Sequence, residues 1–182
     1  IREDALVSVE PQHHLTAGQQ LSAAVISLCR IFERILTDVY MKQVISINVA
    51  ETISNQHSSW VRTLPAILKT QSERLENKSM ENSLAAAHVF GSYYWSIILL
   101  TRPFLIYRVA QYVKGKLDSS SETRNGSSRI SLFADACVYS ALRGLDVVDD
   151  LSHHTSLPRR LPFLINSVFN SVIVLGAAFF AD

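Results

Sequence analysis

The residues of this chain whose types and spacing carry the most chemistry are Arg102 and Pro103. They interrupt an almost continuously apolar stretch, residues 93–105. Proline has no backbone N–H, so Pro103 frees the carbonyl of Leu99 from its helical hydrogen bond. The Arg102 guanidinium has five donors and can reach freed carbonyls or a carboxylate on a neighbouring helix. The pair therefore favours a structural kink in which Arg102 bonds to the backbone groups that the kink frees. The alternative is that Arg102 belongs to an anion or effector site.

Cysteine chemistry is the next candidate, because a thiol beside a histidine can act as a nucleophile. Cys137 lies next to the apolar stripe of Ala134, Val138 and Ala141, which indicates a buried, unreactive thiol. Cys29 is the second of only two cysteines, so a four-cysteine zinc site is excluded. Two reduced, buried thiols are expected rather than a disulfide.

The other titratable clusters do not form a reactive group. The pairs His13-His14 and His153-His154 point their rings in different directions on any regular element, so they are poor chelates. Asp146, Asp149 and Asp150 fit a solvated helix end. The sequence has no His-Glu-x-x-His, no Gly-x-Ser-x-Gly and no glycine-rich phosphate loop. We therefore predict no catalytic, cofactor-binding or metal residues and a protein that is not an enzyme.

Composition indicates one folded domain. The chain has 182 residues, of which 48% are hydrophobic and 18% charged, and this excludes a disordered protein. The formal net charge is +1, and no basic run exceeds two residues. Nucleic-acid binding by this segment is not expected, because it needs clustered Lys and Arg. The chain begins without Met and stops within an apolar pattern, so we expect a piece of a longer protein.

Apolar periodicity predicts the elements that would position these residues. Leu21, Val25, Leu28, Phe32, Ile35 and Val39 form a stripe with steps of four and three, which predicts a helix over 19–45 after an irregular lead-in at 1–18. A second helix is predicted from about 48, kinked or restarted at Pro65. Helices over 131–151 and from 163 to the end follow a polar, mobile loop at 118–129. No segment alternates with period two, so strands are not supported.

The central element is a helix over about residues 84–114, apolar on two faces. One stripe holds Ala86, Phe90, Tyr93, Ile97, Leu100, Phe104 and Tyr107. The other holds Leu84, His88, Gly91, Trp95, Ile98, Arg102, Leu105, Val109 and Tyr112. Such a helix belongs inside a protein. The predicted fold class is all-α, an irregular multi-helix bundle around this buried helix.

A membrane-spanning role is not expected. The uninterrupted apolar run Val172–Ala181 is too short for a bilayer core of roughly 30 Å. Arg102 and Pro103 split the other candidate span.

The order of several motifs along the chain resembles a known family. Trp60 is followed by Leu64-Pro65 and then by residues 98–105, Ile-Leu-Leu-Thr-Arg-Pro-Phe-Leu. This order resembles the fungal-specific transcription factor domain, which is the middle homology region of fungal zinc-cluster regulators. Ala141 and the apolar helix at Ser167–Leu175 extend the likeness over residues 20–182. The residues that carry the family motif are Trp60, Pro65, Thr101, Arg102, Pro103, Cys137 and Pro158.

The resemblance implies a regulatory, non-catalytic helical domain over residues 19–182 in a nuclear protein that controls RNA polymerase II transcription. It implies a six-cysteine, two-zinc DNA-binding cluster elsewhere in the parent protein, so zinc and DNA would be bound only there. Partners would be the transcription machinery or other regions of the same chain, with a small-molecule effector as a further possibility.

The alternative is a helical small-molecule-binding or enzyme domain. Its pocket would be lined by the aromatic and cationic side chains near the centre of the buried helix, namely Tyr93, Trp95, Arg102 and Tyr107.

Overall fold

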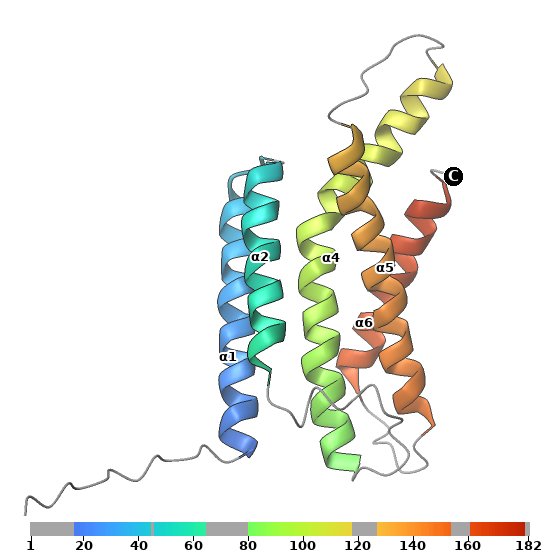
Figure 1. The fold of residues 1–182 in the computed structure, drawn as a ribbon. Coiled ribbons are helices and arrows are strands. Elements are labelled where there is room, and N and C mark those ends of the chain that lie inside the picture. Colours follow the sequence, from blue (N-terminus) through green and yellow to red (C-terminus); the bar gives the residue numbers. More distant parts are fainter. Residues whose placement is uncertain (1–16, 45, 65–79, 118–126, 154–160, 181–182) are drawn as a thin grey trace, which may run out of the picture.

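The computed structural model describes residues 17–44, 46–64, 80–117, 127–153 and 161–180. This part of the chain contains helices and no strands, which confirms the all-α prediction. The elements are α1 (Ala17–Ile35), the π-helical segment η1 (Leu36–Met41), α2 (Ile47–Thr63), α4 (Met80–Leu117), α5 (Ser127–Ser152) and α6 (Pro162–Phe179), shown in Figure 1.

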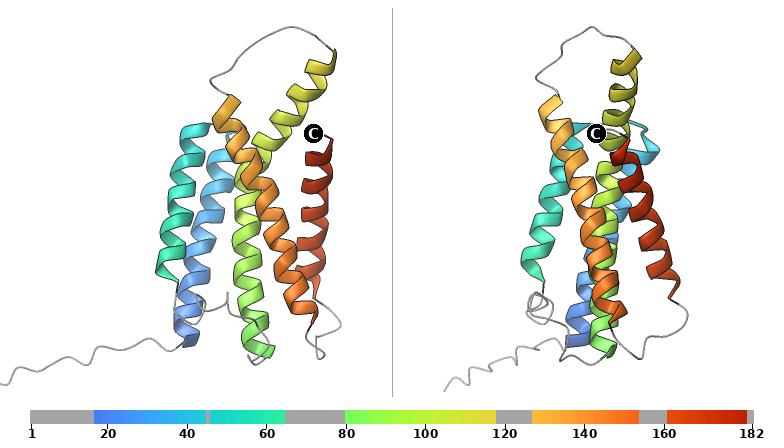
Figure 2. Two further views of the ribbon diagram at one scale, coloured as in Figure 1. Left: turned by 45° about the vertical axis from the view of Figure 1, so that its right-hand side comes forward. Right: turned by 90° about the vertical axis from the view of Figure 1, so that its right-hand side faces the viewer.

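The helices form an up-and-down bundle with α4 at its centre. Each helix runs antiparallel to the one before it, and α1 and α2 form a hairpin on one side of α4 (Figure 1). Both α5 and α6 pack on the other side of α4, as the turned views in Figure 2 also show. The last turns of α4 lean away from its first turns, as expected of a helix that contains a proline.

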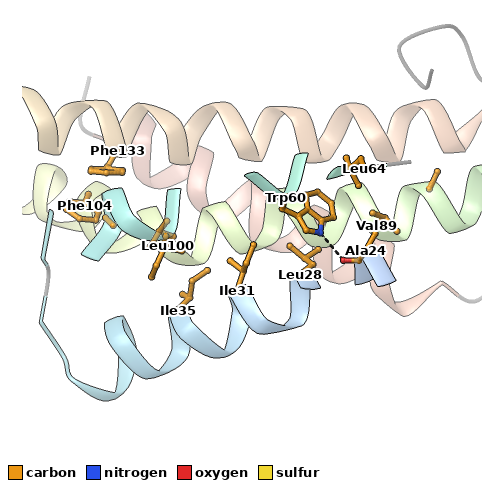
Figure 3. Close-up of a cluster of buried hydrophobic side chains, with 13 residues drawn as sticks. Ala24, Leu28, Ile31, Ile35, Trp60, Leu64, Val89, Leu100, Phe104 and Phe133 are labelled. Carbon is orange, nitrogen blue, oxygen red and sulfur yellow. Dashed lines mark hydrogen bonds between the residues drawn. The ribbon is translucent and has the colours of Figure 1, made fainter. Parts of the chain in front are cut away.

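One core lies between the α1–α2 hairpin and α4 (Figure 3). Spacing of three and four along α1 places Ala24, Leu28, Ile31 and Ile35 in this core. The predicted stripe included Val25, which is exposed; the smaller Ala24 is buried in its place, where Nε1 of Trp60 donates a 2.8 Å hydrogen bond to its carbonyl. This bond ties α2 to α1.

A second core lies between α4, α5 and α6. It is built largely from small side chains, which allow the helices to approach closely: Ile98, Leu105, Ala134, Cys137, Ala141, Val174 and Ala178. Gly91 of α4 makes room for α6, since a Cβ at this position would lie 2.3 Å from Cζ of Phe163.

The two apolar stripes of α4 face these two cores. Ala86, Leu100 and Phe104 from the first stripe join the core with α1 and α2, whereas Ile98 and Leu105 from the second join the core with α5 and α6. A two-faced helix at the centre of the bundle is thus confirmed at the level of individual side chains. Three stripe residues differ: His88 and Tyr107 are exposed, and Arg102 of the second stripe bonds to Tyr40 of η1.

Two predicted boundaries were wrong, and a third cannot be compared. The helix α2 ends at Thr63, and Leu64 has φ −58° and ψ 136° because the residue before a proline avoids helical geometry. The predicted kink or restart at Pro65 lies outside the described residues. The helix α4 runs from Met80 to Leu117, so it extends beyond the predicted range of about 84–114 at both ends. The predicted loop 118–129 is too long, because Ser127–Arg129 form the first turn of α5.

Other predictions fall partly or wholly outside the described residues. The structure does not describe residues 1–16 of the predicted lead-in, residues 118–126 of the predicted loop, or the motif residues Pro65 and Pro158. The helix predicted over 19–45 corresponds to α1 and η1 together, and the chain turns after Met41 through Gln43, which has a positive φ of 52°.

Candidate functional site

The carbonyl that Pro103 leaves open is occupied by a side chain from another helix. The helix α4 continues through Pro103, and the hydroxyl of Tyr40 in η1 donates a 2.8 Å hydrogen bond to the Leu99 carbonyl. Nη2 of Arg102 in turn donates to the Tyr40 hydroxyl oxygen at 3.1 Å. We call this arrangement of Tyr40, Leu99 and Arg102 the Tyr40 cap.

In the Tyr40 cap, the hydrogen-bond acceptor of Arg102 is the neutral phenol of Tyr40. Cζ of Arg102 also lies 5.6 Å from the centre of the Tyr40 ring, within the range of a cation–π contact. Burial raises the pKa of Tyr40, although the Arg102 charge opposes this, so the phenol keeps its proton and remains a donor. Arg102 thus supports the helix at Pro103 in a defined way: it bonds to the Tyr40 hydroxyl, which bonds to the carbonyl that Pro103 leaves open.

The other described motif residues are also bonded internally. The hydroxyl of Thr101 donates to the Ile97 carbonyl at 2.6 Å, and Sγ of Cys137 lies 4.0 Å from the Ile98 carbonyl. The predicted burial of Cys137 is confirmed, and burial raises the pKa of its thiol to about 11, so the thiol keeps its proton at neutral pH. Both cysteines are free, but the expectation that both are buried was wrong, since Cys29 is exposed.

The four residues predicted to line a pocket do not come together. Tyr93 stacks on Trp60 at 5.2 Å between ring centres. Trp95 packs against the core between α4, α5 and α6, Arg102 belongs to the Tyr40 cap, and Tyr107 is exposed. Tyr93 and Tyr107 belong to one stripe of α4, and Trp95 and Arg102 belong to the other, so the four side chains leave the helix on two sides.

A cleft does exist between α2, α4 and α5, with a volume of about 500 Å³. Its lining shares only Tyr93 with the predicted pocket; the other lining residues are Glu51, Ser54, Asn55, His57, Ser58, Ile97, Leu100, Thr101, Arg129, Leu132, Phe133 and Ala136. We call it the α2–α5 cleft. Volumes of about 300–1,000 Å³ are typical of small-molecule sites.

An ion pair joins two walls of this cleft. Nη1 of Arg129 in α5 lies 2.9 Å from Oε1 of Glu51 in α2, and the side chains are 64% and 43% exposed. Such an exposed pair contributes at most about 1 kcal/mol to folding.

His57 is the most perturbed titratable group near the cleft. It is 4% exposed, with Nδ1 3.1 Å from the Ile53 carbonyl and Nε2 2.7 Å from the Ser96 hydroxyl. Burial lowers its pKa to about 4, so the ring is neutral at physiological pH. A neutral ring carries one proton, and the tautomer sets which of these two nitrogens donates.

The Ser96–His57 pair resembles a nucleophile and its base by distance, but its surroundings argue for a structural role. Ser96 is fully buried and does not line the cleft, and its hydroxyl also lies 2.7 Å from the Tyr93 carbonyl. A nucleophile must reach its substrate, and this hydroxyl cannot. Among the described residues no group of three metal-binding side chains occurs.

The helix α6 carries a second kind of surface. It contains no charged residue, and five of its large apolar side chains are exposed on one side: Ile165, Phe169, Val172, Ile173 and Phe179. We call this the α6 face. Both α6 and residues 83–115 of α4 are long and apolar enough to cross a membrane. In the most apolar 18-residue stretch of each helix, 17% is buried in α6 and 44% in α4. Core helices of soluble proteins pass the same test, so this is weak evidence for a membrane.

The sequence contained partial signals for what was missed. His57 follows Ile53 by four residues and precedes Trp60 by three, which places it on the buried side of α2. Tyr40 directly follows Val39, the last member of the α1 stripe. The contacts of these rings across helices had no signal in the sequence.

Comparison with protein-family models, with curated proteins and with solved structures finds no match to this chain. The family resemblance therefore rests on the motif residues themselves.

Proposed function

We propose that this chain is a non-catalytic regulatory domain of a fungal zinc-cluster transcription factor, which acts in the nucleus through protein contacts. The observation that carries the proposal is how the most specific part of the family motif is used. Within residues 99–103, the Leu99 carbonyl, Thr101 and Arg102 all take part in internal hydrogen bonds. Motif residues bonded in this way stabilise the shape of a helix. This is the role expected of a motif that is shared within a family of non-catalytic domains.

The α6 face supports the choice of protein contacts. Apolar side chains gathered on one uncharged helix are more typical of an interaction surface than of a surface that faces water. The partner would be the transcription machinery or another region of the parent chain. In this proposal DNA and zinc are bound by the parent protein's cysteine cluster.

A transcription reporter tests this role. The chain is fused between a zinc-cluster DNA-binding domain and a strong activation domain, and reporter expression is compared with that of a fusion that lacks it. A regulatory domain is expected to lower or condition the output. Phe169→Ser and Ile173→Ser on the α6 face should reduce this effect, while Ile106→Ser, which replaces an exposed apolar residue of α4, should not.

Protein levels measured by immunoblot separate regulation from degradation. Equal reporter output with and without the chain, at equal protein levels, would exclude the regulatory role. The sequence of the parent gene gives a second test, because a complete enzyme domain with no six-cysteine cluster would contradict the family assignment.

A further inference from the structure

We propose that the α2–α5 cleft binds a free amino acid with an apolar side chain, held as a zwitterion between Glu51 and Arg129. The inference goes beyond the transcriptional role and does not depend on it, because it rests on the lining of the cleft. Three features carry it: opposite charges at one edge, an apolar floor, and a polar wall on α2.

The charges at the edge select a ligand that carries both signs. Glu51 and Arg129 lie 2.9 Å apart and both line the cleft. A ligand with only a negative charge would meet the Glu51 carboxylate, and one with only a positive charge would meet the Arg129 guanidinium. The ammonium and carboxylate of an amino acid can replace this pair, each facing the opposite charge.

Opening the ion pair costs little, because both side chains are solvent-exposed and such pairs are weak. The Arg129 guanidinium has five N–H donors in a planar fork, so it can hold a carboxylate bidentately. Ser54, Asn55 and Ser58 on the same side of α2 supply further hydroxyl and amide groups beside the charges.

The floor of the cleft selects an apolar side chain. Ile97, Leu100 and Phe133 present hydrocarbon surface from α4 and α5. The hydroxyl of Thr101 is already bonded to the Ile97 carbonyl, so it does not require a polar ligand group. A volume of about 500 Å³ admits a leucine or phenylalanine with a few water molecules.

Calorimetric titration of the purified chain tests the site, with L-leucine and L-phenylalanine as probes at concentrations up to about 10 mM. One molecule per chain is expected to bind. N-acetyl-L-phenylalanine lacks the ammonium charge and L-phenylalaninamide lacks the carboxylate. Each should bind at least about tenfold more weakly, because each loses a charge-assisted hydrogen bond.

The variants Glu51→Gln and Arg129→Gln should each weaken binding at least about tenfold. Arg143→Gln is the matched control, because Arg143 forms a similar exposed ion pair with Asp146 and does not line the cleft. Thermal melting shows whether each variant is folded, and if one is not, the two analogues decide instead. Absence of binding by both amino acids, equal binding of the analogues, or unchanged binding by the folded charge variants would overturn the proposal.

Discussion

The hydroxyl of Tyr40 donates a 2.8 Å hydrogen bond to the carbonyl of Leu99, the acceptor that Pro103 cannot serve. A side chain 59 residues away in the sequence thus completes the backbone bonding of the central helix. Arg102 bonds to the same hydroxyl and keeps it in place. The Tyr40 cap couples the end of the α1–η1 helix to the middle of α4.

Tyr40→Phe should lower the free energy of unfolding by about 1–2 kcal/mol, because the Leu99 carbonyl and the Arg102 donor both lose their partner. Urea denaturation measures the loss. Pro103→Ala supplies the matched background, since an N–H at position 103 can bond to the Leu99 carbonyl directly. The cost of Tyr40→Phe should shrink in that background, and purely additive effects would show that the cap does not act on this carbonyl.

Arg102→Leu should destabilise the fold by about 1–2 kcal/mol, and Arg102→Lys by less, because Lys retains a charge above the Tyr40 ring. These losses are smaller than the 3–5 kcal/mol typical of breaking a buried ion pair, since the Arg102 partner is a neutral phenol. Identical denaturation midpoints for wild type and both variants would contradict a contribution from Arg102.

His57 should make the fold sensitive to mild acid. Its pKa falls from 6.5 to about 4 on folding, so between these pH values the unfolded chain binds a proton that the folded chain excludes. The free energy of unfolding is highest above about pH 6.5 and should fall toward pH 4 by an amount on the order of 3 kcal/mol.

His57→Gln isolates this contribution, because the other titratable groups are unchanged. The stability of this variant should depend less on pH between 6.5 and 4 than that of wild type. Parallel curves of stability against pH for the two proteins would show that His57 is not buried in neutral form.

Ser171→Ala should raise the free energy of unfolding by about 1 kcal/mol or more, because its hydroxyl is buried without a hydrogen-bond partner among the described residues. Part of any gain comes from the higher helix propensity of Ala. Ser22→Ala on the exposed side of α1, where the hydroxyl donates to the Gly18 carbonyl of the same helix, is the comparison for that part. A gain at position 171 no larger than at position 22 would show that the buried hydroxyl carries no penalty.

The sequence was most informative where burial follows periodicity. The two stripes of α4 predicted both cores because a helix turned toward protein on two sides must be apolar on two sides. The same reasoning placed Cys137 in the core. Periodicity reports which side of one helix is buried, and says nothing about which residue of another helix lies opposite.

The candidate site was less predictable for this reason. Tyr93 was chosen because it is aromatic and central, and it does line the α2–α5 cleft. Glu51 and Arg129 were missed because each is an ordinary exposed charge until α2 and α5 bring them together. The acceptor of Arg102 was missed because Tyr40 approaches from a distant part of the chain.

The π-helical segment η1 sets the rotational phase of the chain ahead of α2. Its i→i+5 bonds accommodate one more residue than an α-helix would over the same axial length, and Tyr40 lies within it. If the same six residues wound as a regular α-helix instead, the extra residue would advance the phase of Tyr40 by up to about 100° around the helix axis. The hydroxyl would then point away from Leu99, so the winding of this one turn decides whether the hairpin is coupled to the central helix, while every apolar side chain of α4 stays the same.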